Sequence, residues 1–222
     1  MTTYRPTTDT RSWRALNWQD ASLAAEEFRL ALSHNRELPT DSPSARHPLL
    51  RHIEHFRPAA VLLLLHWRPQ GVDIILTKRQ YHLKHHPGQI SLPGGRQDPQ
   101  DRDLAATALR EAHEEIGLPS EQVRMLGGLP ALLTVSGYEV TPLVGWLDQP
   151  FRATPNPGEV AQVFHLPLLY LLNPDHAHRF RIERRSGAVE VLAIPYQAHF
   201  IWGASASMLN SFRQRLLLHR PF

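Results

Sequence analysis

The chain has 222 residues, of which 42% are hydrophobic and 20% charged, as expected for one globular domain with a buried core. It contains no cysteine, which excludes disulfides, thiolate metal sites and a catalytic thiol. The net charge of +3 is too small to indicate nucleic-acid binding. The polar N-terminus lacks a signal-peptide core, and the apolar run 59–65 is too short to span a bilayer. We therefore expect a cytoplasmic protein with neither a membrane nor a nucleic-acid partner.

The N-terminal part, residues 1–57, is predicted to be an extension of the main domain. Asp20 can cap a helix over roughly 21–34, where apolar residues recur at helical spacing. The segment 38–58 contains four prolines and no periodic pattern, which indicates a linker. Residues 58–222 are then predicted to form a single domain.

The first half of this domain begins with two predicted strands. The segment 59–67 is apolar without alternation, as in a strand that is covered on both faces. A turn at 68–71 and a second apolar run at 72–77 predict a hairpin. After a basic segment at 78–86, a short strand at 89–92 is expected to lead into a Pro93-Gly94-Gly95 turn.

The strongest helix signal covers residues 103–116, with Asp103 as its cap, Gly117 at its end and Pro119 beyond. Strands are predicted at 123–126 and 140–146, a hairpin from 179–183 and 189–193, and a last helix at 204–219. Strands mixed with two or three helices predict an α/β or α+β sandwich.

The helix at 103–116 carries three carboxylates on one side. With about 100° per residue, Glu114 and Glu115 both fall within about 60° of Glu111, at the border of an apolar stripe. Three neighbouring negative charges weaken a helix unless a cation offsets them, and carboxylate oxygens suit magnesium or manganese. Arg110 can hold one of these carboxylates through a forked pair. A solvated acidic face is the alternative interpretation.

The order Arg110-Glu111-Ala112-His113-Glu114-Glu115-Ile116-Gly117-Leu118, preceded by Gly95, resembles the signature of the Nudix hydrolases. The match departs upstream, because Gly95 lies fifteen residues before Arg110, one more than is usual. Asp101 stands six residues after Gly95, where the signature has a glutamate. This resemblance implies an α/β/α sandwich with a mixed central β-sheet, and leaves Asp101 a role in orienting the loop.

The segment 75–95 resembles the signature of one branch of that superfamily, the coenzyme A pyrophosphatases. Its matching residues are Leu76, Thr77, Arg79, Gly88, Pro93, Gly94 and Gly95. Ile75, Gln80, Lys84 and Leu92 depart from the pattern. Residues 136–142 and 200–203 are also similar to that branch, so that the resemblance covers roughly residues 58–210.

The resemblance implies a hydrolase that cleaves the diphosphate of coenzyme A or an acyl-CoA with Mg²⁺ or Mn²⁺. Glu111 and Glu115 would bind the metal, and Glu114 would be a further ligand or the base. Glu159, in a loop, is the other candidate base, and Arg110 would position the carboxylates. The predicted substrate-binding residues are Lys78, Arg79, Lys84, Gly94 and Gly95.

Three alternatives remain open on the sequence. The substrate could be another nucleotide, such as ADP-ribose or NADH, or the domain could bind a nucleotide without cleaving it. A zinc site at His85-His86 is a poorer option, since no spacing completes a tetrahedral set. Homodimerisation is compatible with these features.

Overall fold

The computed structural model describes residues 20–33, 50, 53–184 and 187–219, so most of the predicted linker at 38–58 lies outside the described residues. The main sheet contains β1 (Arg57–Arg68), β2 (Gly71–Arg79), β3 (Ile90–Ser91), β4 (Gly94–Arg96), β5 (Arg124–Gly128), β6 (Leu132–Leu133), β7 (Tyr138–Leu147) and β8 (Val160–Pro167). A second sheet contains β9 (His178–Arg184), β10 (Gly187–Tyr196) and β11 (His199–Trp202). The helices are α2 (Ala21–Ser33), α3 (Leu104–Ile116), α4 (Leu168–Leu172) and α5 (Ala204–His219), with 3-10 turns at Ser120–Gln122 and Pro174–His176.

The main sheet is mixed, with the order β3-β2-β1-β7-β5. The β1–β7 pair is parallel, and β1 pairs antiparallel with β2. The short β4 also pairs with β1, where Ala60 lies opposite Gly95 and Val61 opposite Gly94. On the far side of β2, β8 forms a long antiparallel ladder. The centre of the fold is therefore β1, which fixes the position of the two glycines.

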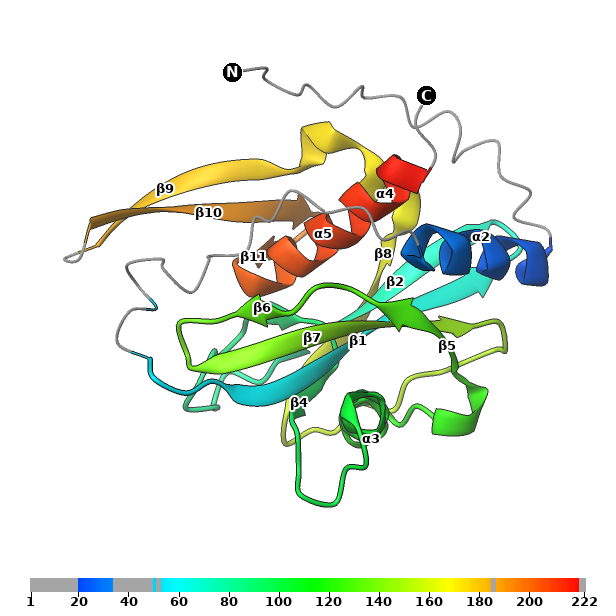
Figure 1. Cartoon of the computed structure of the whole chain (residues 1–222), viewed down its shortest axis with the longest axis horizontal. Coiled ribbons are helices and arrows are strands. Elements are labelled where there is room, and N and C mark those ends of the chain that lie inside the picture. The colour runs from blue at the N-terminus through cyan, green and yellow to red at the C-terminus, as the bar shows by residue number, and fades with distance from the viewer. Residues whose placement is uncertain (1–19, 34–49, 51–52, 185–186, 220–222) are drawn as a thin grey trace.

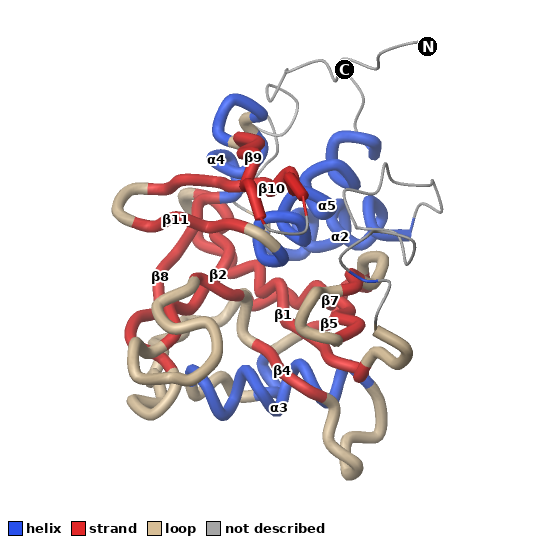
Figure 2. Tube along the Cα trace, turned by 90° about the vertical axis from the view of Figure 1, so that its left-hand side faces the viewer, coloured by secondary structure: helices blue, strands red, loops and turns tan. Residues whose placement is uncertain are grey.

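Helices cover both faces of this sheet, giving three layers (Figure 1). One face of β1 (Val61, Leu63, Leu65) packs in a core shared with α2 and α5, whereas the alternate residues (Ala60, Leu62, Leu64) pack with α3. Figure 2 shows α3 on one side of β1 and β4, with α2 and α5 on the other. Because successive strand residues point to opposite faces, burial on both faces explains the unbroken apolar run of β1. The predicted α/β/α sandwich with a mixed central sheet is confirmed.

The N-terminal helix belongs to the larger of these two cores. Asp20 caps α2 by accepting hydrogen bonds from the amides of Ser22 and Leu23, as predicted. Phe28 is fully buried, with its ring 5.7 Å from that of Trp146 and 6.3 Å from that of Phe212. The division of the chain at residue 57 stays a prediction, but α2 packs as a layer of the fold.

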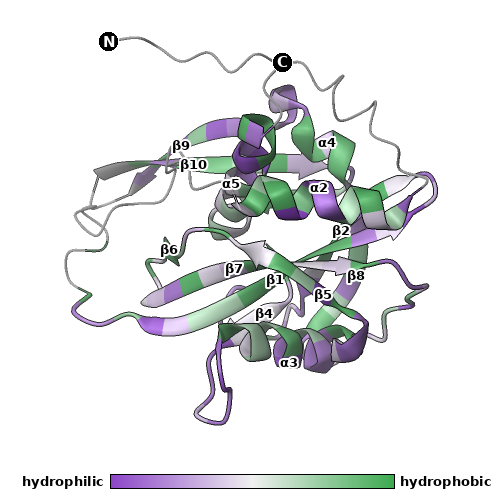
Figure 3. Ribbon diagram, turned by 45° about the vertical axis from the view of Figure 1, so that its right-hand side comes forward, coloured by the Kyte–Doolittle hydropathy of each residue, from purple (hydrophilic) through white to green (hydrophobic). Residues whose placement is uncertain are grey.

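The predicted hairpins and the helices at 103–116 and 204–219 are confirmed within one to three residues at each end. The prediction of a Pro93-Gly94-Gly95 turn was wrong, because Gly94 and Gly95 begin β4 and pair with β1. The strands β8 and β11 and the helix α4 were not predicted. In Figure 3, β9 is largely hydrophilic and α4 largely hydrophobic. Among the described residues, no helix is both long and apolar enough to cross a bilayer.

Candidate active site

The helix α3 presents the glutamates, and its ends are fixed by local chemistry. The Asp103 side chain accepts a hydrogen bond from the Ala106 amide at 2.7 Å, which satisfies a free donor of the first turn. Gly117, at φ 69°, closes the helix in the left-handed conformation that favours glycine. Ala108, Ala112 and Ile116 are fully buried against the sheet. The glutamates lie along one edge of this apolar stripe, and they are therefore at the border between the helix and the sheet.

The glycines of β4 allow the helix to approach the sheet closely. A Cβ at Gly95 would lie 2.6 Å from the carboxylate of Glu111. A Cβ at Gly94 would lie 2.4 Å from the carbonyl oxygen of Ala60, and Gly94 also has a φ of +152°. Only glycine fits either position without displacing its neighbours. Gly94 thus allows β4 to lie against β1, and Gly95 leaves room for the carboxylate of Glu111.

Glu115 is the most buried carboxylate of this edge, at 3% exposed. Burial raises the pKa of Glu115 to about 8, against the opposing effect of Arg79. The charges of Glu111 and Glu159 raise the pKa of Glu115 further, whereas a hydrogen bond with the Gly94 backbone lowers it. Its Oε2 atom has no hydrogen-bond partner in the described part of the chain. A buried, unpartnered carboxylate oxygen is costly unless a cation or a donor satisfies it.

Glu111 lies next to Glu115 and has a side chain that is 16% exposed. Burial raises the pKa of Glu111, and the guanidinium of Arg110, 3.0 Å from its Oε1, opposes this shift. Glu114 and Glu159 add negative charge that also raises the pKa of Glu111. The exposed Glu159, from the loop before β8, therefore lies close enough to act on both buried glutamates.

Glu114 lies further out than the other two. Its side chain is 53% exposed, and its Oε2 accepts a hydrogen bond from Arg110 at 3.1 Å. Glu111 and Glu115 therefore face the sheet, whereas Glu114 borders the solvent.

Arg110 is held by a carboxylate outside the helix. Its Nε and Nη2 donate to the two oxygens of Asp101, each at 3.0 Å. Asp101, whose side chain is 5% exposed, also accepts hydrogen bonds from the Thr107 hydroxyl and the Asp98 amide. The bond from Arg110 is the main reason why the pKa of Asp101 falls to about 2. The prediction that Arg110 forms its forked pair with a carboxylate of the helix was wrong, because the pair is made with Asp101 of the preceding loop. The remaining nitrogen of Arg110 reaches Glu111 and Glu114.

The three predicted cations of the segment 78–86 lie in different places. Arg79 acts on the charge of Glu115 from the end of β2, and its Nε is buried with no hydrogen-bond partner in the described part of the chain. Lys78, the preceding residue, lines a cavity with residues of β11. Lys84 is exposed in the loop between β2 and β3. The structure therefore brings Arg79, Gly94 and Gly95 to the glutamates and leaves Lys78 and Lys84 apart from them.

The donors fit a divalent cation that is shared with a substrate. Within the described ranges, no three acidic or histidine side chains converge closely enough to form a metal site. Magnesium commonly takes one or two carboxylates and completes its shell with phosphate oxygens and water. Glu111 and Glu115 supply two hard oxygen donors, one of them unpartnered. They would hold such a cation with its remaining positions free.

Sequence reasoning assigned no role to His199 and Trp202, which line the cavity beside Lys78. They are far from Lys78 along the chain, and their position depends on how the second sheet packs. The sequence feature that could have pointed to this wall is the similarity of residues 200–203 to the coenzyme A pyrophosphatase branch.

Comparisons with known proteins agree on the family. A model of the NUDIX domain matches residues 56–183. A protein of Photorhabdus laumondii named "Uncharacterized Nudix hydrolase NudL" is 39% identical over 169 residues, covering 76% of this chain and 90% of its own. A protein of the same name from Escherichia coli O1:K1 is 39% identical over 182 residues, covering 79% of this chain and 93% of its own.

Solved structures give more distant matches. An Ap4A hydrolase of C. elegans is 22% identical, with a TM-score of 0.44 over 50% of this chain and 80% of its own. A MutT/nudix family protein of Enterococcus faecalis is 14% identical, with a TM-score of 0.46 over 94% of this chain and 74% of its own. With the helix signature, the glycines of β4 and the family match over more than half of its length, the chain belongs to the Nudix hydrolase family.

Proposed function

We propose that this Nudix hydrolase cleaves the diphosphate linkage of coenzyme A or an acyl-CoA. The products would be 4′-phosphopantetheine, or its acyl form, and adenosine 3′,5′-bisphosphate. The observation that carries the proposal is that the charge of Arg79, at the end of β2, acts on the buried Glu115 and lowers its pKa. Arg79, Gly94 and Gly95 all belong to the segment that resembles the coenzyme A pyrophosphatase signature, and all three border the glutamates of α3.

In this reaction, the oxygen of a water molecule forms a bond to one phosphorus atom as the bond from that phosphorus to the bridging oxygen breaks. The bridging oxygen leaves with the other phosphate, and a carboxylate takes the proton of the water. Nudix hydrolases generally use divalent metal ions such as Mg²⁺ or Mn²⁺, which lower the pKa of a bound water and neutralise charge on the diphosphate.

The side chains of the chain divide the remaining tasks. Glu111 and Glu115 would bind the cation, and Arg79 would pair with a diphosphate oxygen through its guanidinium. Arg110, clamped by Asp101, would keep Glu111 in place. Glu159 and Glu114 are the candidates for the base, since both border the buried pair and reach the solvent.

The test is hydrolysis of coenzyme A by the purified protein with Mg²⁺ or Mn²⁺, with the products separated by chromatography. Glu115→Gln should lower kcat by at least about 100-fold, because it removes a charged ligand that acts on the transition state. Glu121→Gln, the same change at an exposed position of the turn Ser120–Gln122, is the matched control and should behave as wild type.

ADP-ribose and NADH in the same assay decide between the alternatives. Cleavage of these compounds without cleavage of coenzyme A would assign the enzyme to another nucleoside diphosphate derivative. Tight binding of all three with no product would make the domain a non-catalytic nucleotide-binding module. A near-normal rate for Glu115→Gln would remove this residue from the mechanism.

A further inference from the structure

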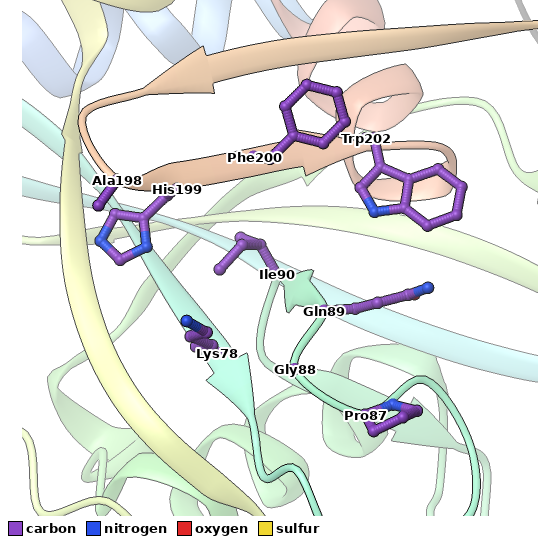
Figure 4. A pocket seen from close by; sticks show the side chains of 9 residues that line it. All are labelled: Lys78, Pro87, Gly88, Gln89, Ile90, Ala198, His199, Phe200 and Trp202. Atoms are coloured by element: carbon purple, nitrogen blue, oxygen red, sulfur yellow. The ribbon is translucent and has the colours of Figure 1, made fainter.

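A cavity of about 370 Å³ lies between the loop that joins β2 to β3 and the strand β11. This volume falls in the range of small-molecule sites. Figure 4 shows its lining side chains, which come from segments far apart in the sequence: Lys78, Pro87, Gly88, Gln89, Ile90, Ala198, His199, Phe200 and Trp202.

The two walls of the cavity differ in origin. Lys78 and the loop lie within the NUDIX match at 56–183, whereas Ala198 to Trp202 lie beyond it. The hydroxyl of Ser205, just after β11, donates a hydrogen bond to the Ile90 carbonyl at 2.9 Å and joins the two walls. The strand β11 therefore adds a surface that lies beyond the matched region.

The added wall is aromatic and open to a ligand. Phe200 is 51% exposed, and Trp202 is half-buried beside it on β11. In Figure 4 the Trp202 indole extends from β11 toward Gln89 of the facing loop. Exposed aromatic rings provide stacking surfaces for a planar group such as a nucleobase.

The opposite wall carries a positive charge. The Lys78 amine lies over the Tyr81 ring at 5.2 Å and forms no ion pair with the carboxylates of the described residues. Nearby, His199 stacks on Phe164 at 3.8 Å, and its Nδ1 atom is buried with no hydrogen-bond partner in the described part of the chain. Aromatic rings beside an unpaired cation favour a ligand that is both planar and anionic.

The cavity and the glutamates lie around the same strand end. Consecutive residues of a strand point to opposite faces. Arg79 acts on Glu115 on the α3 side, and Lys78 lines the cavity on the β11 side. A substrate whose diphosphate lies at Glu115 would therefore reach the cavity by passing around the end of β2.

We propose that this cavity binds an adenosine 3′-phosphate group, with the adenine stacked on Trp202 and Phe200 and the 3′-phosphate paired with Lys78. The proposal rests on the proposed function in taking this group to be one end of coenzyme A. The other end, the pantetheine arm, is neither aromatic nor phosphorylated and would use neither feature. The strand β11 of the second sheet thus selects the substrate, and the glutamates of α3 carry out its hydrolysis.

The test measures binding without turnover. Adenosine 3′,5′-bisphosphate and adenosine 5′-monophosphate are titrated calorimetrically into the full chain in the presence of a chelator. The wild type should bind the bisphosphate at least about tenfold more tightly, since a charge-assisted pair in a cavity is worth about 1.4 kcal/mol or more. Lys78→Gln should abolish this preference, and Lys78→Arg should largely keep it.

The stacking wall is tested in the same titration. Trp202→Leu should weaken binding of both nucleotides about tenfold, in line with the loss of base stacking, and Trp202→Phe should restore most of it. Phe200→Leu, at a position that is 51% exposed and whose ring contacts Phe180 at 5.8 Å, gives a second measure of stacking. Arg124→Gln is the matched control, because it removes an exposed charge from β5 at the opposite edge of the sheet.

The outcomes distinguish a failure of the proposed pocket from a failure of the proposed diphosphatase function. An unchanged preference in Lys78→Gln, or unchanged affinity in both Trp202→Leu and Phe200→Leu, would overturn the proposed pocket. Equal kcat/KM for coenzyme A and its 3′-dephospho form would do the same while leaving the diphosphatase intact. Selective bisphosphate binding by a protein that does not cleave coenzyme A would support the pocket and sink the proposed function.

Discussion

At the scale of single residues, the site is defined by two carboxylates with opposite environments. Glu115 is buried, one of its oxygens has no hydrogen-bond partner among the residues that the structure describes, and its pKa rises to about 8. The Asp101 carboxylate accepts hydrogen bonds from Arg110, Thr107 and the Asp98 amide, and its pKa falls to about 2. Burial alone therefore does not set the charge state, because the donors around each oxygen decide it. Glu115 therefore keeps the character of the cation ligand that we propose, whereas the oxygens of Asp101 already accept hydrogen bonds.

Glu115 should reduce the stability of the protein when no cation is bound. Its pKa is raised above the unfolded value, so the folded state loses stability as pH rises from about 4.5 to about 8. Glu115→Gln in the presence of a chelator should raise the free energy of unfolding at pH 8 by about 2–3 kcal/mol, with the gain vanishing near pH 5. Urea denaturation at both pH values measures this, and a lower stability of the variant at pH 8 would contradict it.

Asp101 should have the opposite pH dependence. Its pKa is depressed by the bond from Arg110, so its contribution is complete above about pH 4 and is lost as pH falls toward about 2. Asp101→Asn should lower the free energy of unfolding by about 2 kcal/mol at pH 7 and by much less near pH 2.5. Asp175→Asn, at an exposed position, is the control. A pH-independent difference between Asp101→Asn and wild type would refute the assignment.

At the scale of elements, each helix has one sheet face to cover. The helix α3 covers the face of Ala60, Leu62 and Leu64, and α2 and α5 cover the other. The loop before α3 is tied back by the Asp101–Arg110 pair, and β4 is held on β1 by its register. The arrangement of the glutamates therefore depends on how α3 packs against β1 and on the glycines of β4 between them.

The contribution of α2 can be measured through Phe28. Phe28→Ala should lower the free energy of unfolding by about 3–5 kcal/mol, because it leaves a cavity between Trp146 and Phe212. Leu23→Ala in the same helix should change it by less than about 0.5 kcal/mol, since Leu23 is 58% exposed. Chemical denaturation of both variants tests the packing, and equal effects would show that α2 does not pack as described.

At the scale of the whole molecule, the NUDIX match supplies mainly the short helix α4 to cover one face of its sheet. The match spans 56–183, but α2 precedes it and α5 follows it. These two helices bury Val61, Leu63 and Leu65. The elements outside the matched region thus complete the core, and β11 adds the cavity wall.

A protein trimmed to residues 56–183 should therefore fail to fold cooperatively. Its exposed sheet face would bind a hydrophobic dye such as ANS and would promote aggregation. A protein trimmed to residues 20–219 should unfold in one cooperative transition and should not bind the dye. Circular dichroism and dye fluorescence compare the two, and a cooperative transition in the shorter protein would show that the flanking helices are dispensable.

The sequence by itself determined the elements whose signals are local. The caps Asp103 and Gly117 and the apolar spacing defined α3, and the order of Glu111, Glu114 and Glu115 identified the family. An unbroken apolar run indicated that β1 is buried on both faces. These features depend on residues a few positions apart, so that periodicity and capping chemistry suffice to predict them.

Tertiary structure alone decided the environments of the side chains. It buried Glu115, gave Arg110 its forked partner in Asp101, and turned Lys78 toward β11 and Arg79 toward α3. It also placed Gly94 and Gly95 in β4, whereas the sequence predicts a turn at these glycines. Burial and charge depend on segments far apart along the chain, since dielectric and hydrogen-bond partners are set by whatever packs against a group. The sequence could therefore identify the glutamates, but it could not predict the burial, the hydrogen-bond partners or the pKa of each one.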